Sequence, residues 1–157
     1  MRKLLIVVLA SIWATGLSGL SADDRQLYEG LYWNEDKSII MQLKLKGDSI
    51  EGTTVWSNGE NSNDINNPDP ILKKRPVVGM VFLWDFVYSE KKNRWKDGQV
   101  YDPDNGKTYD AKMSIKDNEQ TIVMRGYIGI SLFGRTAEFM RLKADDIPVE
   151  LANITSD

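Results

Sequence analysis

The 157-residue sequence contains no cysteine and no histidine. Without cysteine, the protein cannot form a disulfide, a thiolate nucleophile or a zinc–sulfur site. Without histidine, it lacks the commonest general base and all imidazole metal ligands, which excludes a Ser-His-Asp triad. Acidic residues outnumber basic ones by 23 to 20, so no basic field favours binding to nucleic acid. These absences favour a single globular binding domain over an enzyme.

The N-terminus has the order of a secretory signal peptide. A short basic stretch precedes the apolar residues 4–17, and small residues follow. The apolar run is shorter than the roughly 20 residues that span a bilayer as a helix. We therefore expect cleavage after Ala22, with Gly19 and Ser18 as alternatives. The sequence predicts an exported protein, periplasmic or secreted, with no membrane span after cleavage.

The remainder of the chain has the pattern of an antiparallel β-structure. Apolar and polar residues alternate over residues 38–46, a period of two that indicates a strand with one buried face. Residues 77–88 are the most apolar segment and are predicted to form a strand covered on both faces. Further strands are predicted at residues 50–56, 94–102, 107–115, 121–127 and 135–142. Their spacing predicts an all-β, up-and-down barrel of about eight strands, with a sandwich as the alternative.

Three regions of the chain are thus distinguished. Residues 1–22 are the predicted signal peptide, residues 23–142 the barrel domain and residues 143–157 a C-terminal tail. Within the barrel domain, the segment from residue 58 to about residue 70 is rich in Asn, Asp, Ser and Pro. This composition predicts a long solvated loop at the mouth of the barrel.

Several sequence blocks carry a resemblance to a known family. They are GLYW at 30–33, WKDGQVYDPDNGKTY at 95–109, RGYIG at 125–129 and GRT at 134–136, with NPD at 67–69 and RP at 75–76 between them. Together they resemble a family of small exported bacterial proteins classed as a domain of unknown function, whose fold is similar to the lipocalin or calycin barrel. The resemblance covers about residues 28–142. It implies a fold and an exported location, but no reaction.

The resemblance also implies how the barrel closes. Lipocalin-like barrels typically carry Gly-x-Trp on the first strand, with an arginine from the last strand packed over the indole. Here Tyr32 occupies the matching position after Gly30, and Trp33 follows it and would face the other way in a regular strand. Arg141 is the candidate cation partner of Tyr32 or Trp33.

Aromatic residues are numerous enough to line a cavity for an apolar or amphipathic ligand, although any one of them taken alone is more typical of a filled core. Trp95 and Tyr101 are the preferred candidates, because the strand that carries them also carries the polar residues Asp97 and Gln99. With Asp97 and Gln99 they have odd numbers and are predicted to share one face. The other candidate ligand-binding residues are Trp84, Arg125 and Tyr127.

Charged residues leave two alternatives open. Asp85 inside the barrel would need Arg125 or Arg135 as a partner, whereas outside it would only keep the strand soluble. Arg125, Arg135 and Arg141 could bind an anionic headgroup or could pair with neighbouring carboxylates. The oxygen-rich residues 102–105 lack the spacing of a calcium loop. We predict no metal, no cofactor and no catalytic residue.

The function that these features favour is binding of a small apolar or amphipathic molecule inside the barrel. The alternative is an inhibitor-like interaction factor of the envelope or the host interface, using residues 58–76 and the hairpin tips. An enzyme would depend on carboxylates such as Asp85 or Asp97, and no spaced pair of acids supports it. The ligand and the oligomeric state are not specified by the sequence.

Overall fold

The computed structural model describes residues 23–152 apart from residues 60–62, 117, 131 and 133. The predicted signal peptide, residues 1–22, lies outside the described residues. In the part of the chain that the structure describes, no helix is long and apolar enough to cross a membrane. Cleavage after Ala22 and export therefore stay predictions.

Nine strands and five short helices make up the described fold. The strands are β1 (Gly30–Trp33), β2 (Ile39–Lys46), β3 (Ser49–Ser57), β4 (Val81–Trp84), β5 (Val87–Ser89), β6 (Arg94–Asp102), β7 (Lys107–Lys116), β8 (Thr121–Tyr127) and β9 (Gly134–Arg141). The helices are η1 (Asp24–Tyr28), η2 (Leu72–Lys74), η3 (Glu90–Lys92), η4 (Ala144–Asp146) and α1 (Val149–Ala152).

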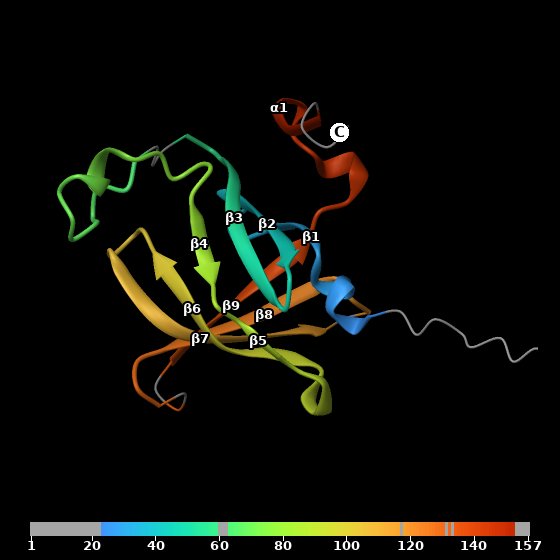
Figure 1. Cartoon of the computed structure of the whole chain (residues 1–157). Coiled ribbons are helices and arrows are strands. Elements are labelled where there is room, and N and C mark those ends of the chain that lie inside the picture. Colours follow the sequence, from blue (N-terminus) through green and yellow to red (C-terminus); the bar gives the residue numbers. More distant parts are fainter. Residues whose placement is uncertain (1–22, 60–62, 117, 131, 133, 153–157) are drawn as a thin grey trace, which may run out of the picture.

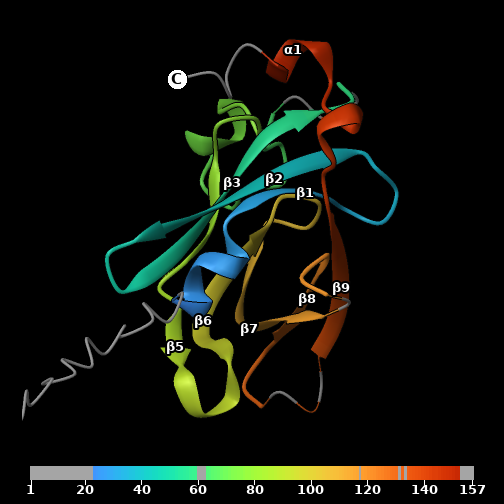
Figure 2. The same ribbon diagram turned by 90° about the vertical axis from the view of Figure 1, so that its right-hand side faces the viewer.

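Eight of the strands close into an antiparallel barrel (Figure 1, and Figure 2 from the side of η1). Apart from β4 and β5, neighbours in the chain pair with one another. In addition, β1 pairs with β9, and β4 pairs with β6. β5 also pairs with β6, on the same edge as β4, so β4 and β5 act as one interrupted strand. The prediction of an up-and-down, lipocalin-like barrel is confirmed.

The apolar segment 77–88 is not one strand covered on both faces, and that prediction is wrong. Asp85 adopts a φ of 60° and separates β4 from β5. Val87 is 52% exposed, so the second half of the segment has a solvent-facing side. The break lets Phe86 pack directly on Gly98, where an added Cβ would overlap the phenyl ring. The positive φ of Asp85, rather than the hydrophobicity of the segment, decides where the strand is interrupted.

One half of the barrel, next to η1, is filled by a close-packed core. Tyr28 of η1 lies edge-on to Trp95 of β6, with ring centroids 6.2 Å apart. Tyr88 of β5 contacts both rings, at 6.4 Å and 5.0 Å. Tyr28 and Trp95 are fully buried, as is Met113 to within 1%. Side chains of this size each stabilise the fold by about 1.5–3 kcal/mol when buried, so this end of the barrel is closed.

Arg141 of β9 fastens the last strand to the start of the barrel. Its guanidinium lies 4.8 Å from the centre of the Tyr32 ring, in a cation–π contact. The same group donates hydrogen bonds to the carbonyl oxygens of Leu27, Glu29 and Glu119. A single side chain thus joins η1, β9 and the turn after β7.

Tyr32 and Trp33 point to opposite sides of β1, as regular alternation predicts. Tyr32 is fully buried beneath Arg141, whereas Trp33 is half-buried and lies edge-on to Trp56, with centroids 5.4 Å apart. Of the two partners expected for Arg141, the structure therefore shows Tyr32. A Cβ at Gly30 would come within 2.5 Å of the Arg141 guanidinium, so glycine is needed where that group crosses β1.

Candidate functional site

The half of the barrel away from η1 holds a cavity of about 1080 Å³. Its inner wall is mainly apolar and includes Ile39, Phe82, Val100, Met124 and Phe139. Pockets for small molecules typically measure roughly 300–1,000 Å³ and combine apolar walls with a few polar groups. The cavity therefore has the size and lining of a small-molecule site.

The pairing of β8 with β9 explains why the barrel is open on this side. Met124 lies opposite Ala137, and Gly126 lies opposite Arg135, so these four positions share the inner side of the two strands. A Cβ at Gly126 would make only an ordinary contact, 3.5 Å from Val100. Small residues at two of the four positions leave the volume that larger side chains would fill.

The mouth of the cavity is polar. Its loops and turns contribute Asn34, Asp36, Ser38, Asn58, Asn63, Asn66, Asp102, Asp104 and Asn105. Burial raises the pKa of Asp104, and the charges of Asp102 and Asp36 raise it further, so three carboxylates gather on one side of the mouth. Arg135 also lines the cavity and makes no ion pair with the described residues. A polar ligand group would find donors and acceptors here.

No metal centre is formed by the described part of the chain. There, no three or more His, Cys, Asp or Glu side chains lie together in a way that could hold a metal ion. Among the mouth carboxylates, Asp36 accepts a hydrogen bond from the backbone N–H of Ser38, and Asp102 accepts one from the backbone N–H of Asp104.

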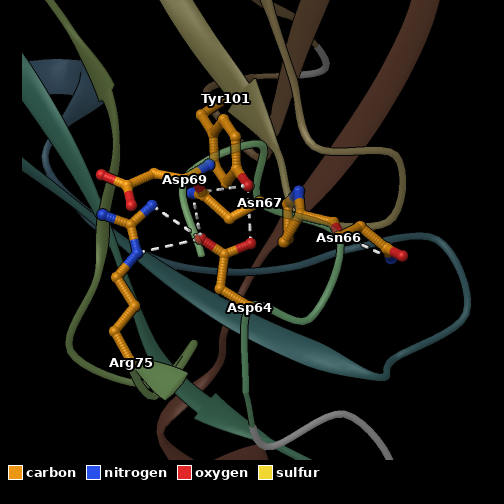
Figure 3. Close-up of polar contacts among 7 residues, drawn as sticks. Asp64, Asn66, Asn67, Asp69, Arg75 and Tyr101 are labelled. Atoms are coloured by element: carbon orange, nitrogen blue, oxygen red, sulfur yellow. Dashed lines mark hydrogen bonds and ion pairs between the residues drawn. The ribbon is translucent and has the colours of Figure 1, made fainter. Parts of the chain in front are cut away.

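One side of the mouth is held by a buried polar cluster, shown in Figure 3. The Asp64 carboxylate is fully buried and accepts hydrogen bonds from the Tyr101 hydroxyl at 2.6 Å, the Asn67 amide at 2.7 Å and Arg75 Nε at 2.9 Å. The Arg75 guanidinium also pairs with Asp64 through Nη2 at 2.8 Å and lies 5.4 Å from the centre of the Tyr101 ring. These four residues, the Asp64 cluster, fix the loop that follows β3 onto β6.

The electrostatics of the Asp64 cluster keep its protonation states fixed at neutral pH. Burial alone raises the pKa of Asp64, but hydrogen bonds from Tyr101, Asn67 and Arg75, with the Arg75 charge, bring that pKa below its usual value. Burial raises the pKa of Tyr101, and the hydrogen bond to Asp64 and its charge raise it further. Tyr101 therefore stays a donor and Asp64 an ionised acceptor, which is the arrangement of a structural clamp.

Comparison with protein families matches residues 30–141 to a family described as an uncharacterized protein conserved in bacteria (DUF2147). The chain belongs to this family. Among solved structures, the chain is similar to protein HP1028 from the human pathogen Helicobacter pylori, which is described as belonging to the lipocalin family. The TM-score is 0.66 and the identity 23%, over 80% of this chain and 87% of that one. No curated protein matches the chain.

These comparisons confirm the family resemblance and the lipocalin-like fold of the barrel. The DUF2147 match begins at the first residue of β1 and ends at the last residue of β9. It therefore includes both the closing contact of Arg141 and the whole Asp64 cluster.

In this DUF2147 domain, the four residues of β6 that were predicted to share one face, Trp95, Asp97, Gln99 and Tyr101, do not do so. The register of β6 shifts between Trp95 and Gly98, where Asp97 adopts a φ of 57°, so the alternation reverses. Trp95 is fully buried in the filled half, Asp97 is exposed, and Gln99 lies outside the cavity lining. Of the four residues predicted to share one face, only Tyr101 lines the cavity, from its rim.

The remaining candidates are distributed over the barrel. Trp84 is half-buried outside the cavity lining, and Arg125 donates a hydrogen bond to Thr136 on the outer side of β9. Tyr127 lines the cavity near its mouth. Asp85 is exposed, so the alternative that placed it inside the barrel with an arginine partner is wrong.

The prediction of a solvated loop is also wrong at two positions, because the side chains of Asp64 and Asn67 are buried, at 0% and 4% exposed. Asn66 extends the same loop across the mouth, where its amide donates to two carbonyl oxygens of the β6–β7 turn. Asn67 and Arg75 belong to the blocks that carry the family resemblance. Asp64 gives no such signal, because an aspartate among asparagines is typical of an ordinary turn.

Proposed function

We propose that the barrel binds a small amphipathic molecule, with its apolar part against the inner wall and its polar part at the mouth. The observation that carries this proposal is the division of the barrel into a filled half and a cavity of about 1080 Å³. A barrel built only for stability would fill both halves, because each unfilled volume gives up packing energy. The lipocalin-like fold supports the same conclusion.

The polarity of the cavity favours an amphipathic ligand over a wholly apolar one. Val100 and Phe139 face the interior with hydrocarbon, and burying a ligand chain there gains about 25 cal/mol for each Å² of apolar surface. Towards the mouth, the amides of Asn66 and Asn105 and the guanidinium of Arg135 replace this hydrocarbon. A polar head left in an apolar cavity would be costly, whereas here it meets hydrogen-bonding groups.

Ala137 and Thr136 offer a matched test of binding. Ala137 lies on the inner side of β9 and lines the cavity, while Thr136 is exposed and faces outward. Ala137→Trp should project an indole ring into the cavity and weaken binding of the fluorescent probe anilinonaphthalene sulfonate at least about ten-fold, the equivalent of roughly 1.4 kcal/mol. Thr136→Trp should leave the affinity unchanged.

Native mass spectrometry of the wild-type protein, purified after exposure to a bacterial lipid extract, would identify the ligand. We expect a bound small molecule that Ala137→Trp no longer retains and Thr136→Trp does. A wild-type protein that binds neither probe nor lipid, or an Ala137→Trp variant that binds like the wild type, would exclude the cavity as the site.

We also propose that this ligand is bound outside the cytoplasm. The support is the signal-peptide pattern around the apolar residues 4–17. Intact-mass measurement of the protein recovered from the periplasm or the medium should give an N-terminus at Asp23. Recovery only from the cytoplasm, with Met1 retained, would contradict export.

A further inference from the structure

Exposed apolar side chains lie on two separate loops that reach the mouth of the cavity. They are Ile65 and Ile71, at 60% and 81% exposed, and Ile128, Ile130 and Leu132, at 67%, 61% and 74%. We call these five residues the mouth ring. Figure 1 shows the green loop and the orange β8–β9 loop projecting at the same end of the barrel, on either side of the β6–β7 turn. Single exposed apolar residues are common, but a group around one opening indicates a contact surface.

The mouth ring is continuous with the cavity. Ile65, Ile128 and Leu132 line the cavity and are also exposed to solvent. Apolar surface therefore extends from the inner wall to the loop tips. Polar side chains such as Asn66 and Asn105 separate the apolar tips from one another.

Free basic residues accompany the apolar tips. Lys73 and Lys74 of η2 follow Ile71 after one intervening residue, Leu72. Both lysines are exposed and make no ion pair with the described residues. Arg75 is neutralised by Asp64, and the two lysines are opposed by Asp69 of the same loop and by the mouth carboxylates Asp36, Asp102 and Asp104. The positive charge is therefore local to η2, in a chain whose net charge is −3. Exposed isoleucine beside lysine is the combination that binds the interface of anionic membranes.

We propose that the mouth ring docks the barrel on the surface of an anionic lipid bilayer, with the cavity opening towards the lipids. Apolar tips set apart by polar groups suit a deformable interface, whereas protein partners usually meet a contiguous, well-packed patch. Two lysines beside Ile71 complement anionic headgroups. Docking does not require that the cavity holds a ligand. If the proposed function holds as well, the bilayer is the source or the destination of that ligand.

The test compares variants of the protein expressed as the full chain and recovered in its processed form, so that all share one N-terminus. Co-sedimentation with vesicles of phosphatidylcholine, with and without phosphatidylglycerol, measures binding. Ile71→Ser combined with Ile130→Ser removes two apolar tips, and the matched control is Val87→Ser combined with Val149→Ser. These control valines are 52% and 81% exposed and lie outside the mouth ring.

We expect the wild type and the valine control to bind phosphatidylglycerol vesicles alike. The isoleucine pair should bind more than roughly ten-fold more weakly, given the hydrophobic transfer of two side chains. Lys73→Gln and Lys74→Gln should each weaken binding roughly five-fold, and only on anionic vesicles. Ala137→Trp, which places an indole ring in the cavity, should bind vesicles like the wild type, which separates docking from ligand binding.

Three outcomes would overturn the proposal. One is a wild-type protein that binds no vesicle, and another is an isoleucine pair that binds as well as the valine control. The third is equal binding to vesicles with and without phosphatidylglycerol. A protein from an envelope extract that binds the wild type and not the isoleucine pair, in the absence of vesicle binding, would identify the mouth ring as a protein interface instead.

Discussion

Asp64→Asn tests how the mouth of the cavity is held in place. The substitution keeps the shape of the side chain but removes its charge and one acceptor oxygen, while the donors of Tyr101, Asn67 and Arg75 stay where they are. Breaking one side of a buried ion pair costs about 3–5 kcal/mol. The Arg75 side chain is 35% exposed, so water can partly solvate the guanidinium, and we expect a loss of about 3 kcal/mol, at the lower end of that range.

Asp85→Asn is the matched control, because it makes the same chemical change at an exposed site. Asparagine tolerates the positive φ of Asp85, so we expect a change within about 0.5 kcal/mol. Urea unfolding of both variants measures the difference. If the loop opens before the barrel unfolds, the loss will appear instead as faster tryptic cleavage after Lys73 and Lys74.

The pH dependence gives an independent measurement of the same interaction. The pKa of Asp64 is lower in the folded protein than its usual value, so the unfolded chain takes up the proton first as the pH falls. The stabilisation is therefore complete above the unfolded pKa of about 3.9 and is lost as the pH falls towards the folded pKa. The difference between wild type and Asp64→Asn should shrink below about pH 4. Equal urea midpoints and equal cleavage rates for Asp64→Asn and Asp85→Asn at neutral pH would refute this reasoning.

Three further predictions concern the filled half of the barrel. Gly98→Ala should destabilise the fold by about 1–3 kcal/mol, because the new Cβ overlaps the ring of Phe86; an unchanged Tm would contradict it. Arg141→Lys should cost about 2 kcal/mol in urea unfolding, because lysine cannot bond three carbonyl oxygens and stack on Tyr32 together; an unchanged midpoint would count against this closing contact. Burial raises the pKa of Tyr28 and of Tyr32 to about 12, so the stability from their neutral hydroxyls is complete below the unfolded pKa of about 10 and is lost as the pH rises. A phenolate absorbance titration in which every tyrosine ionises near pH 10 in the folded protein would disagree.

Much of the fold could be predicted from the sequence, because period-two alternation and turn residues are local signals. The predicted strands at 94–102, 121–127 and 135–142 lie within one residue of β6, β8 and β9. The prediction fails where one aspartate adopts a positive φ. Asp85 divides an apolar run, and Asp97 reverses the faces of β6. Many aspartates can take this conformation, and nothing local distinguishes these two from the others.

The candidate site was less predictable, because it consists of distant parts. Asp64 and Tyr101 are 37 positions apart in the chain and meet only after β6 is in place. The cavity is harder still, since it is a volume that side chains leave empty. The sequence does not show that Gly126 and Ala137 line a cavity, because this depends on the register that places both on the inner side of the barrel.

The unequal filling of the barrel separates stability from binding. The large buried rings of Tyr28, Tyr32 and Trp95 lie in the filled half, where each contributes about 1.5–3 kcal/mol. Ala137 itself contributes little of this, because its side chain is already exposed in the cavity. Substitutions at the mouth should therefore change what is bound while the barrel stays folded, and the Asp64 cluster is the exception, because it joins the mouth to β6. If Ala137→Trp lowered the stability as much as Gly98→Ala does, the two halves would be energetically coupled, and the cavity could not be treated as a separate binding site.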